Sequence, residues 1–285
     1  MTESIAGMVE NARVRLAAAG IEAARLEACV LFEHAAGFDR AALLSRGREP
    51  AGLAAAKRYG MLLDERVRRV PLAYLTGERE FWSLRLRVDR RVLVPRPETE
   101  TLVEAALERI GPGAWVADVG TGSGAIVIAL ARELGAGTFF GTDRCAAAIE
   151  VARANAAEHG VARRIVFLEG DLLDPLAVLS GSLDVLISNP PYIPTAELGD
   201  LQPEVRDHEP RAALDGGADG LDLIARIIAG APPLLRPGGW LLLEVGAGQA
   251  GLVLSLLRRS GRYEELSTRC DLAGIERVVA ARRAA

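Results

Sequence analysis

The first 75 residues place apolar side chains every three or four positions, a spacing that predicts α-helices. One apolar stripe comprises Ile5, Met8, Val9, Ala12 and Leu16. Gly20 would end this helix, Gly37 would end a second one, Asp39 would cap a short third one, and a fourth is predicted from Pro50 to Val70. No catalytic constellation stands out here, so a purely structural bundle and a substrate-docking module both stay open.

The period of the apolar positions then changes to two. Leu84, Leu86 and Val88 alternate with charged side chains, which predicts a half-exposed strand. Residues 92–94 are expected to pair with it as a hairpin between two domains. The next segment, Pro95–Glu100, has a proline suited to the first position of a helix and glutamates that complement a helix N-terminus. Local physics alone predicts a helix start here and no further role.

From Trp115 onward the pattern of strand, loop and helix repeats. Strands are predicted at residues 114–117, 138–141, 164–168, 183–187 and 240–245, with two late strands near 262–268 and 275–280. Helices are predicted at residues 125–134, 146–159 and 221–235. Strands that alternate with helices predict an α/β fold with a parallel, doubly wound sheet. Ligands of such a sheet bind at the carboxyl ends of its strands.

A glycine-rich loop, Asp118–Gly124, follows the first of these strands directly. Asp143 ends the second strand, where an acidic residue typically accepts hydrogen bonds from a ribose, and Asp171 follows the third. Each aspartate alone could be a turn or a helix cap. Together they predict a bound adenosine cofactor. The loop reads G-x-G-x-G and contains no Lys or Arg, which favours S-adenosylmethionine, although NAD remains open from this half of the site alone.

The segment Ser188–Tyr192 follows the apolar strand at residues 183–187 and contains an amide, two prolines and an aromatic ring. A residue before proline is restricted to extended backbone, and proline has no N–H to donate. The stiff segment therefore offers two acceptors, the Asn189 side-chain oxygen and the Pro190 carbonyl. Two acceptors and a ring suit a flat group that carries an NH2. The simpler alternative is a turn, because Asn-Pro favours turns.

Composition and charge argue against several classes of protein and site. The 285 residues are half apolar, and the net charge of −4 disfavours a broad phosphate-binding surface. Three cysteines and three histidines lie far apart, which predicts neither a disulfide framework nor a metal site. The acidic start Met1–Ser4 is not typical of a signal peptide, and no apolar stretch reaches 18 residues. We therefore expect a cytoplasmic protein with no membrane association.

The motifs resemble a known family. The glycine loop with Asp143, Asp171 and Asn189-Pro190-Pro191-Tyr192 is similar to class I S-adenosylmethionine-dependent methyltransferases, and the tetrapeptide narrows these to enzymes that methylate planar NH2 nitrogens. Further stretches resemble the bacterial release-factor glutamine methyltransferases of the HemK/PrmC type: residues 71–78, 81–82, 94–100, 209–217 and 219–221. DNA methyltransferases share the tetrapeptide, whereas its combination with Pro95–Glu100 is far more specific. The resemblance covers most of the chain.

The resemblance implies a domain plan and an activity. Residues 1–78 would form an N-terminal helical domain for substrate docking, 79–105 a β-hairpin linker, and 106–285 a class I, Rossmann-like methyltransferase domain. The activity would be methyl transfer from S-adenosyl-L-methionine to the glutamine side-chain nitrogen, N5, in the Gly-Gly-Gln loop of class I peptide-chain release factors. We would expect a monomer without direct nucleic-acid binding. N6-adenine methylation of nucleic acid is the main alternative; a non-enzymatic cofactor-binding protein and a dinucleotide oxidoreductase are two others.

The resemblance also implies roles for individual residues. Those implied for the cofactor are Asp118, Gly120, Thr121, Gly122, Ser123, Gly124, Asp143, Asp171, Leu172 and Asn189. The glycine loop would contact the methionine end, Asp143 the ribose, and Asp171 and Leu172 the adenine. Where the family often has an aromatic or bulky residue this sequence has Leu172, so stacking would become aliphatic packing. The substrate glutamine would be held by Asn189, Pro190, Pro191 and Tyr192, of which Asn189, Pro190 and Tyr192 would be catalytic.

Overall fold

The computed structural model describes residues 3–285, so the first two residues of the acidic start lie outside it. The chain forms two compact units. The first contains the residues up to Glu78 together with Gln202–His208, and the second contains Arg79–Leu201 and Glu209–Ala285. The chain therefore leaves the second unit after Leu201, contributes seven residues to the first, and returns at Glu209.

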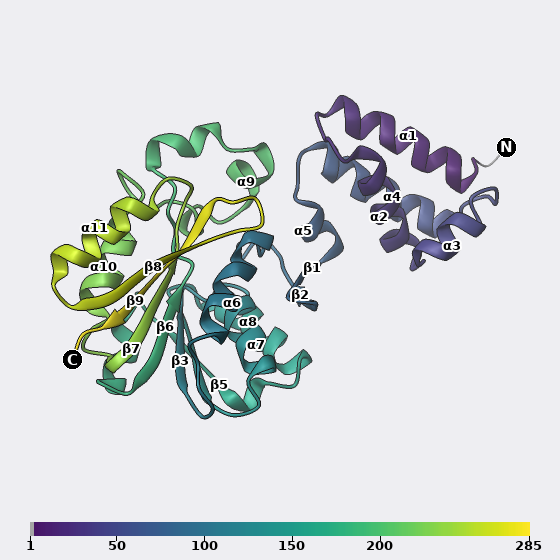
Figure 1. Cartoon of the computed structure of the whole chain (residues 1–285). Helices are drawn as coiled ribbons and strands as arrows, with labels where there is room; N and C mark the ends of the chain where they lie inside the picture. The colour runs from purple at the N-terminus through teal and green to yellow at the C-terminus, as the bar shows by residue number, and fades with distance from the viewer. Residues whose placement is uncertain (1–2) are drawn as a thin grey trace. The chain divides into compact units, whose positions relative to one another are not determined.

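The first unit is helical, as the apolar spacing predicts (Figure 1). Its helices are α1 (Ile5–Ala18), α2 (Ala24–Ala36), α3 (Arg40–Ser45), α4 (Leu53–Val67), α5 (Leu72–Thr76) and, from the later segment, α9 (Pro203–His208). Asp39 caps α3 by accepting from Ala42 N, and Gly37 ends α2 in the left-handed conformation. The fourth helix is shorter than predicted, because Arg69 takes a left-handed φ of 68° and Pro71 cannot donate to a continued helix.

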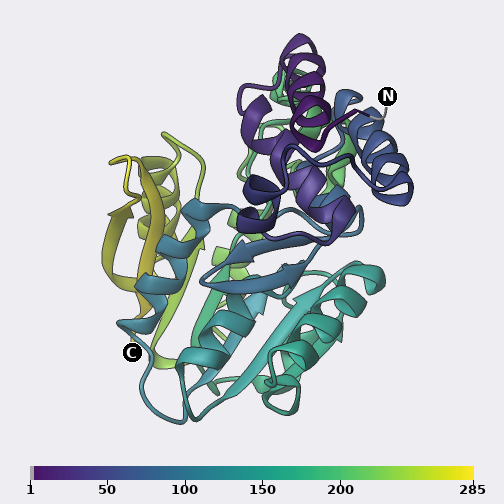
Figure 2. The same cartoon turned by 90° about the vertical axis from the view of Figure 1, so that its right-hand side faces the viewer.

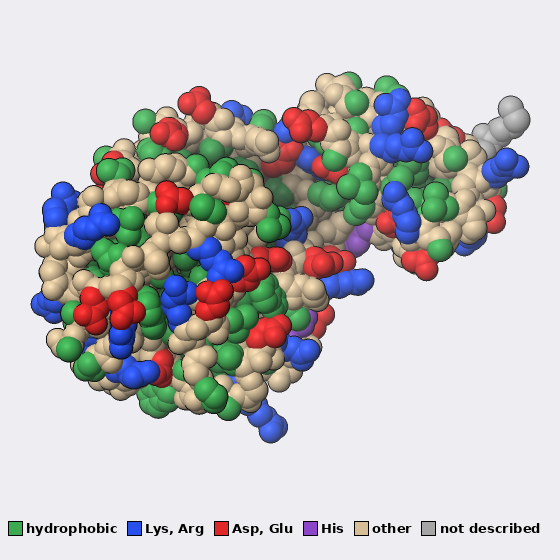
Figure 3. Space-filling model, viewed as in Figure 1, with side chains coloured by type: hydrophobic (Ala, Val, Ile, Leu, Met, Phe, Trp, Pro, Cys, Tyr) green, Lys and Arg blue, Asp and Glu red, His purple; other side chains and the backbone are tan. Residues whose placement is uncertain are grey.

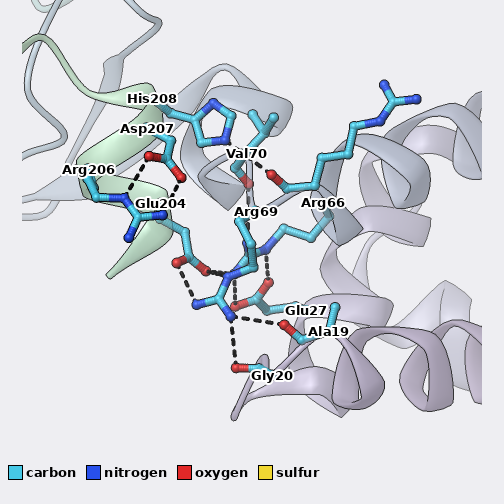
Figure 4. Close-up of polar contacts among 11 residues, drawn as sticks. Ala19, Gly20, Glu27, Arg66, Arg69, Val70, Glu204, Arg206, Asp207 and His208 are labelled. Carbon is cyan, nitrogen blue, oxygen red and sulfur yellow. Dashed lines mark hydrogen bonds and ion pairs between the residues drawn. The ribbon is translucent and has the colours of Figure 1, made fainter. Parts of the chain in front are cut away.

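A cluster of ion pairs around the buried Arg66 attaches α9 to the rest of the first unit (Figure 4). Arg66 of α4 is only 4% exposed and pairs with Glu27 of α2 and with Glu204 of α9. Arg69 pairs with Glu204 at 2.6 Å and also donates to the carbonyls of Ala19 and Gly20. Burial would raise the pKa of Glu204, but hydrogen bonds from Arg69 and Arg66 hold that pKa below its usual value.

A short hairpin opens the second unit, seen as two blue strands near the centre of Figure 2. Its strands are β1 (Glu78–Phe81) and β2 (Leu84–Arg87), joined by a two-residue turn in which Trp82 and Ser83 both have positive φ. The predicted pairing of residues 84–88 with residues 92–94 is therefore wrong: the partner strand precedes the turn, and residues 92–94 form no strand. Trp and Ser are not typical of such a turn, so the sequence gives no signal for it.

A seven-stranded sheet in the order β5-β4-β3-β6-β7-β9-β8 forms the centre of the second unit. Its strands are β3 (Trp115–Val119), β4 (Thr138–Asp143), β5 (Ile165–Glu169), β6 (Leu183–Ser188), β7 (Leu235–Glu244), β8 (Tyr263–Cys270) and β9 (Glu276–Arg283). The first five strands in that order are parallel, but β9 is antiparallel to both β7 and β8. The predicted α/β sheet is thus confirmed, with one edge antiparallel because a short turn without a helix joins β8 to β9.

Helices cover both faces of this sheet (Figure 1). One face packs against α6 (Glu100–Leu107), α7 (Ala125–Glu133) and α8 (Ala146–Glu158), and the other against α10 (Asp222–Gly230) and α11 (Ala250–Ser260). The residues of each strand alternate between the faces; Val116 points to the first and Ala117 to the second. Helix α10 ends earlier than predicted, because Pro232 and Pro233 cannot continue it.

Short 3₁₀ helices make several of the connections. They are η1 (Pro97–Thr99), η2 (Ala162–Arg164), η3 (Asp174–Leu179), η4 (Thr195–Asp200) and η5 (Arg211–Ala213). The Pro95–Glu100 segment does start a helix, with Pro97 in the first turn of η1 and α6 directly after it. Across residues 3–285, each helix is too short or too polar to cross a membrane.

Candidate active site

The predicted cofactor loop and the tetrapeptide leave the sheet at the same edge. In the sheet register, Val119 of β3 lies beside Ser188 of β6 and beside Thr142 of β4, and Asp143 lies beside Glu169 of β5. The residues that directly follow these parallel strands therefore gather at their carboxyl ends, the usual place for a ligand in such a sheet.

The glycine loop is held tightly to its neighbouring strand. The N–H groups of Gly120 and Thr121 both donate to the Thr142 carbonyl, at 2.9 and 2.8 Å. Gly120, Gly122 and Gly124 have φ of 75°, 54° and 83°, which a residue with a side chain rarely adopts. A Cβ on Gly120 or Gly122 would meet nothing within 4 Å, so these two glycines keep space open in front of the loop.

Other residues of the glycine loop hold the loop in place and do not face the pocket. Asp118 is fully buried behind the loop, where its Oδ2 accepts from the Thr121 hydroxyl at 2.6 Å. Among the described residues its Oδ1 has no hydrogen-bond partner, and burial raises the pKa of this carboxyl to about 7. The Ser123 carbonyl accepts from Asn155 of α8. Asp118, Thr121, Ser123 and Gly124 thus lie outside the lining of the pocket.

The carboxylates of the next two strands face the loop differently. Asp143 accepts from Gly122 N through Oδ2 at 3.0 Å and from Cys145 N through Oδ1 at 2.9 Å, which fixes its orientation. Asp171 pairs with Arg226 of α10. Leu172 takes a left-handed φ of 46°, and its carbonyl accepts from the buried Thr142 hydroxyl. A non-glycine residue held in this conformation is strained, a feature that often marks ligand sites.

These groups surround a pocket of about 900 Å³, including its open mouth. The predicted residues that line it are Gly120, Gly122, Asp143, Asp171, Leu172, Asn189 and Pro191. The lining residues that the sequence did not single out for the cofactor or substrate are Arg91, Val92, Leu93, Arg144, Cys145, Ala148, Pro210, Ala212, Ala213 and Leu223. Residues 210–213 belong to a motif noted for its resemblance, whereas residues 92–94 had been assigned to a strand. Between residues 3 and 285, no group of three or more His, Cys, Asp or Glu is placed to hold a metal ion.

The tetrapeptide is anchored on both sides. Just before it, Ser188 donates from its hydroxyl to the Val119 carbonyl at 2.6 Å. At its end, the Tyr192 carbonyl accepts from Gln249 Nε2 at 2.9 Å. Pro190 is buried and, like Tyr192, lies outside the lining of the pocket. A Cβ on Gly216 would lie 2.8 Å from both the Pro191 oxygen and the Tyr192 Cα, so this glycine permits close packing under the tetrapeptide.

Several charged groups lie behind the tetrapeptide. Glu244 ends β7 and is 1% exposed. Burial raises the pKa of this carboxyl to about 7, while hydrogen bonds from Thr99 and Asn189 and the charge of Arg277 act in the opposite direction. Burial, with a smaller effect of the Glu244 charge, raises the pKa of Tyr192 to about 12, so its phenol is neutral near pH 7. Thr99 lies in the Pro95–Glu100 segment noted for its resemblance, but neither Thr99 nor Glu244 is among the predicted site residues.

Comparison with known proteins assigns both parts of the chain. Residues 8–77 match the family model of the PrmC N-terminal domain, and residues 110–243 match a methyltransferase domain. The crystal structure of a methyltransferase from Pyrococcus furiosus superposes with a TM-score of 0.56 at 17% identity and covers 78% of this chain and 99% of that one. This likeness shows the class I methyltransferase fold.

Two relatives are similar over almost their whole length. The release factor glutamine methyltransferase of Moorella thermoacetica is 48% identical over 94% of this chain and 95% of its own. The protein of the same name from Geobacter sulfurreducens is 44% identical over 98% of this chain and 96% of its own. The predicted resemblance is confirmed. The chain has a methyltransferase fold with a pocket at the strand ends, and it is 44–48% identical to these relatives over nearly its full length. It therefore belongs to the release factor glutamine methyltransferases.

Proposed function

We propose that this protein transfers a methyl group from S-adenosyl-L-methionine to the side-chain N5 of the glutamine in the Gly-Gly-Gln loop of class I peptide-chain release factors. The observation that carries the proposal is the shared pocket: Asn189 and Pro191 line the same cavity as Gly120, Gly122 and Asp143. The part suited to an amide and the part suited to an adenosine cofactor thus open into one space, which group transfer requires. The names of the relatives point to the same substrate.

The pocket fits the proposed cofactor. The open space in front of Gly120 and Gly122 leaves room for a ligand against the loop backbone. Asp143 offers carboxylate lone pairs suited to ribose hydroxyls, and Asp171 offers an acceptor for an adenine amino group. Leu172 would pack on the adenine as an aliphatic side chain. When bound, S-adenosyl-L-methionine supplies an electrophilic methyl group on a sulfonium.

The tetrapeptide would prepare the glutamine nitrogen for attack. An amide nitrogen is a poor nucleophile because its lone pair is delocalised into the carbonyl, and its two N–H groups are donors. Asn189 Oδ1 and the Pro190 carbonyl would accept from these two N–H groups and hold the nitrogen in line with the methyl carbon. As the N–C bond formed, the S–C bond would break with its electron pair remaining on sulfur as a neutral thioether, and the nitrogen would then release one proton to solvent. Tyr192, a neutral phenol, would pack beside the amide.

We also assign substrate docking to the helical first unit. Its match to the PrmC N-terminal domain and its lack of predicted catalytic groups support this role. Nucleic acid is a less suitable target. On the face shown in Figure 3, acidic and basic side chains are interspersed, and the net charge of the chain is −4.

The deciding experiment is a tritiated methyl-transfer assay. The acceptors are a purified class I release factor, its variant with alanine in place of the Gly-Gly-Gln glutamine, and duplex DNA. Label on the normal factor alone is the expected result. Label on DNA, or equal label on the alanine variant, would overturn the proposed substrate.

A further inference from the structure

The Pro95–Glu100 segment, predicted only to start a helix, reaches the tetrapeptide. Thr99, the last residue of η1, is 4% exposed, and its Oγ1 accepts from Asn189 Nδ2 at 3.1 Å across 90 residues of sequence. The segment itself is pinned at both ends. Arg96 pairs with the buried Glu209 at 2.6 Å, and Glu100 accepts from Trp82 N at 2.7 Å. Thr99 is therefore a fixed partner for the amide.

The carboxyl of Glu244 lies beside the same pair of residues and comes from a different strand. β7 lies directly beside β6, with Leu243 opposite Ser188, so Glu244 and Asn189 follow neighbouring strand positions. The Glu244 carboxyl lies close enough to Thr99 and Asn189 for both side chains to lower its pKa, and its Oε2 has no hydrogen-bond partner among the described residues. Neither Thr99 nor Glu244 lines the pocket, so both act from behind Asn189.

An asparagine amide has two different ends, and the proposed reaction can use only one. A substrate NH2 needs an acceptor, which is Oδ1; a flipped amide would present Nδ2 and place two donors face to face. On the opposite side, Thr99 and Glu244 favour the Nδ2 end of the Asn189 amide. A hydroxyl can donate or accept, but the Thr99 hydroxyl directs its proton toward the Glu244 carboxyl, so its lone pairs are left for Asn189 and attract Nδ2 rather than Oδ1.

We propose that Thr99 and Glu244 are positioning residues that hold the Asn189 amide with its Nδ2 turned away from the pocket and its Oδ1 turned toward the substrate. This rests on the proposed function, in which Asn189 accepts from the glutamine NH2. The chain of contacts explains why a helix start and a strand end that are distant in sequence both meet the tetrapeptide. Loss of this support should lower turnover about 10- to 100-fold, because a small misplacement of a positioning group has effects of that size.

The test compares Thr99→Val, which removes the hydroxyl at nearly constant volume, with Thr99→Ser, which keeps it. Thr101→Val is the matched control, since Thr101 is also buried and lies two residues further on. We expect Thr99→Val to lower kcat about 10- to 100-fold with an unchanged KM for S-adenosyl-L-methionine. Thr99→Ser should recover most of kcat, and Thr101→Val should resemble the starting enzyme. Equal kcat for Thr99→Val and the starting enzyme, or equal loss in the Val and Ser variants, would overturn the proposal.

A double-mutant cycle separates this proposal from the proposed function. If Thr99 acts through Asn189, adding Thr99→Val to Asn189→Ala should cause no further loss of kcat. Additive losses would show that Thr99 acts independently and would refute the positioning role. Full turnover by Asn189→Ala alone would instead refute the proposed role of Asn189. Glu244→Gln, which keeps an acceptor oxygen, should retain more turnover than Glu244→Leu; equal loss in these two variants would exclude Glu244 from the positioning pair.

Discussion

Glu244 should make the second unit less stable as the pH rises. Its carboxyl is 1% exposed, and burial raises its pKa from 4.5 to about 7. Below pH 4.5 the carboxyl is protonated in both the folded and the unfolded chain. Between pH 4.5 and 7 the unfolded chain loses this proton while the folded chain keeps it, so the free energy of unfolding falls. Above pH 7 the loss is complete.

The size of the effect follows from the shift. A pKa difference of about 2.5 units corresponds to about 3 kcal/mol, because each unit is worth about 1.4 kcal/mol. Most of this loss develops between pH 5 and pH 8. The Glu244→Gln variant cannot ionise at this position. Relative to the normal protein, the free energy of unfolding of this variant should therefore rise by about 2 to 3 kcal/mol between these two pH values.

Urea unfolding followed by tryptophan fluorescence measures this difference. Trp82, Trp115 and Trp240 all belong to the second unit, so the signal reports on the unit that contains Glu244. Glu264→Gln is the matched control, since Glu264 is exposed on β8. Its difference from the normal protein should stay constant with pH. A constant difference for Glu244→Gln as well would show that the Glu244 carboxyl is not destabilised by burial, and the reasoning would fail.

Three further substitutions follow from the contacts. Arg66→Ala should destabilise the first unit by about 3 kcal/mol, because it removes a buried cation that pairs with two half-buried glutamates. Arg13→Ala, in an exposed ion pair, should change stability by less than about 1 kcal/mol. Hydrogen exchange of the helices measures both changes. Gly216→Ala should lower kcat at least about tenfold by displacing the tetrapeptide, whereas Gly251→Ala, whose Cβ meets nothing within 4 Å, should not. Asn189→Ala should bind S-adenosyl-L-methionine normally in calorimetry but lose most turnover; near-normal methyl transfer would contradict its role.

The strands and their ligand edge could be predicted because their signals are local. Apolar runs, the glycine loop and the aspartates at strand ends lie within a few residues of one another, and the parallel topology then brings them together. The β1–β2 hairpin could not be predicted in the same way. Its turn contains Trp82 and Ser83 with positive φ, a conformation that the surrounding structure stabilises against the residues' own preference.

The supports of the site could not be predicted because each joins distant segments. Thr99 meets Asn189 across 90 residues, and Glu209 meets Val94 N across 115. In the linear sequence Thr99 is one of several polar residues at a helix start, and Glu244 is the last residue of an apolar strand. Only the strand order, which places β7 beside β6, puts that carboxyl behind the tetrapeptide.

The two buried carboxyls of the site lower the stability of the folded chain, but each also fixes the orientation of a neighbouring group. Asp118 supports the glycine loop through Thr121, and Glu244 meets the tetrapeptide through Thr99 and Asn189. Burial raises the pKa of both carboxyls to about 7, so each lowers the stability of the folded chain at neutral pH. A carboxylate is also the strongest acceptor that a side chain offers, so it can orient a hydroxyl or an amide that an apolar residue would leave free to rotate. We infer that the fold gives up stability at these two positions in return for a fixed orientation of the groups that face the pocket.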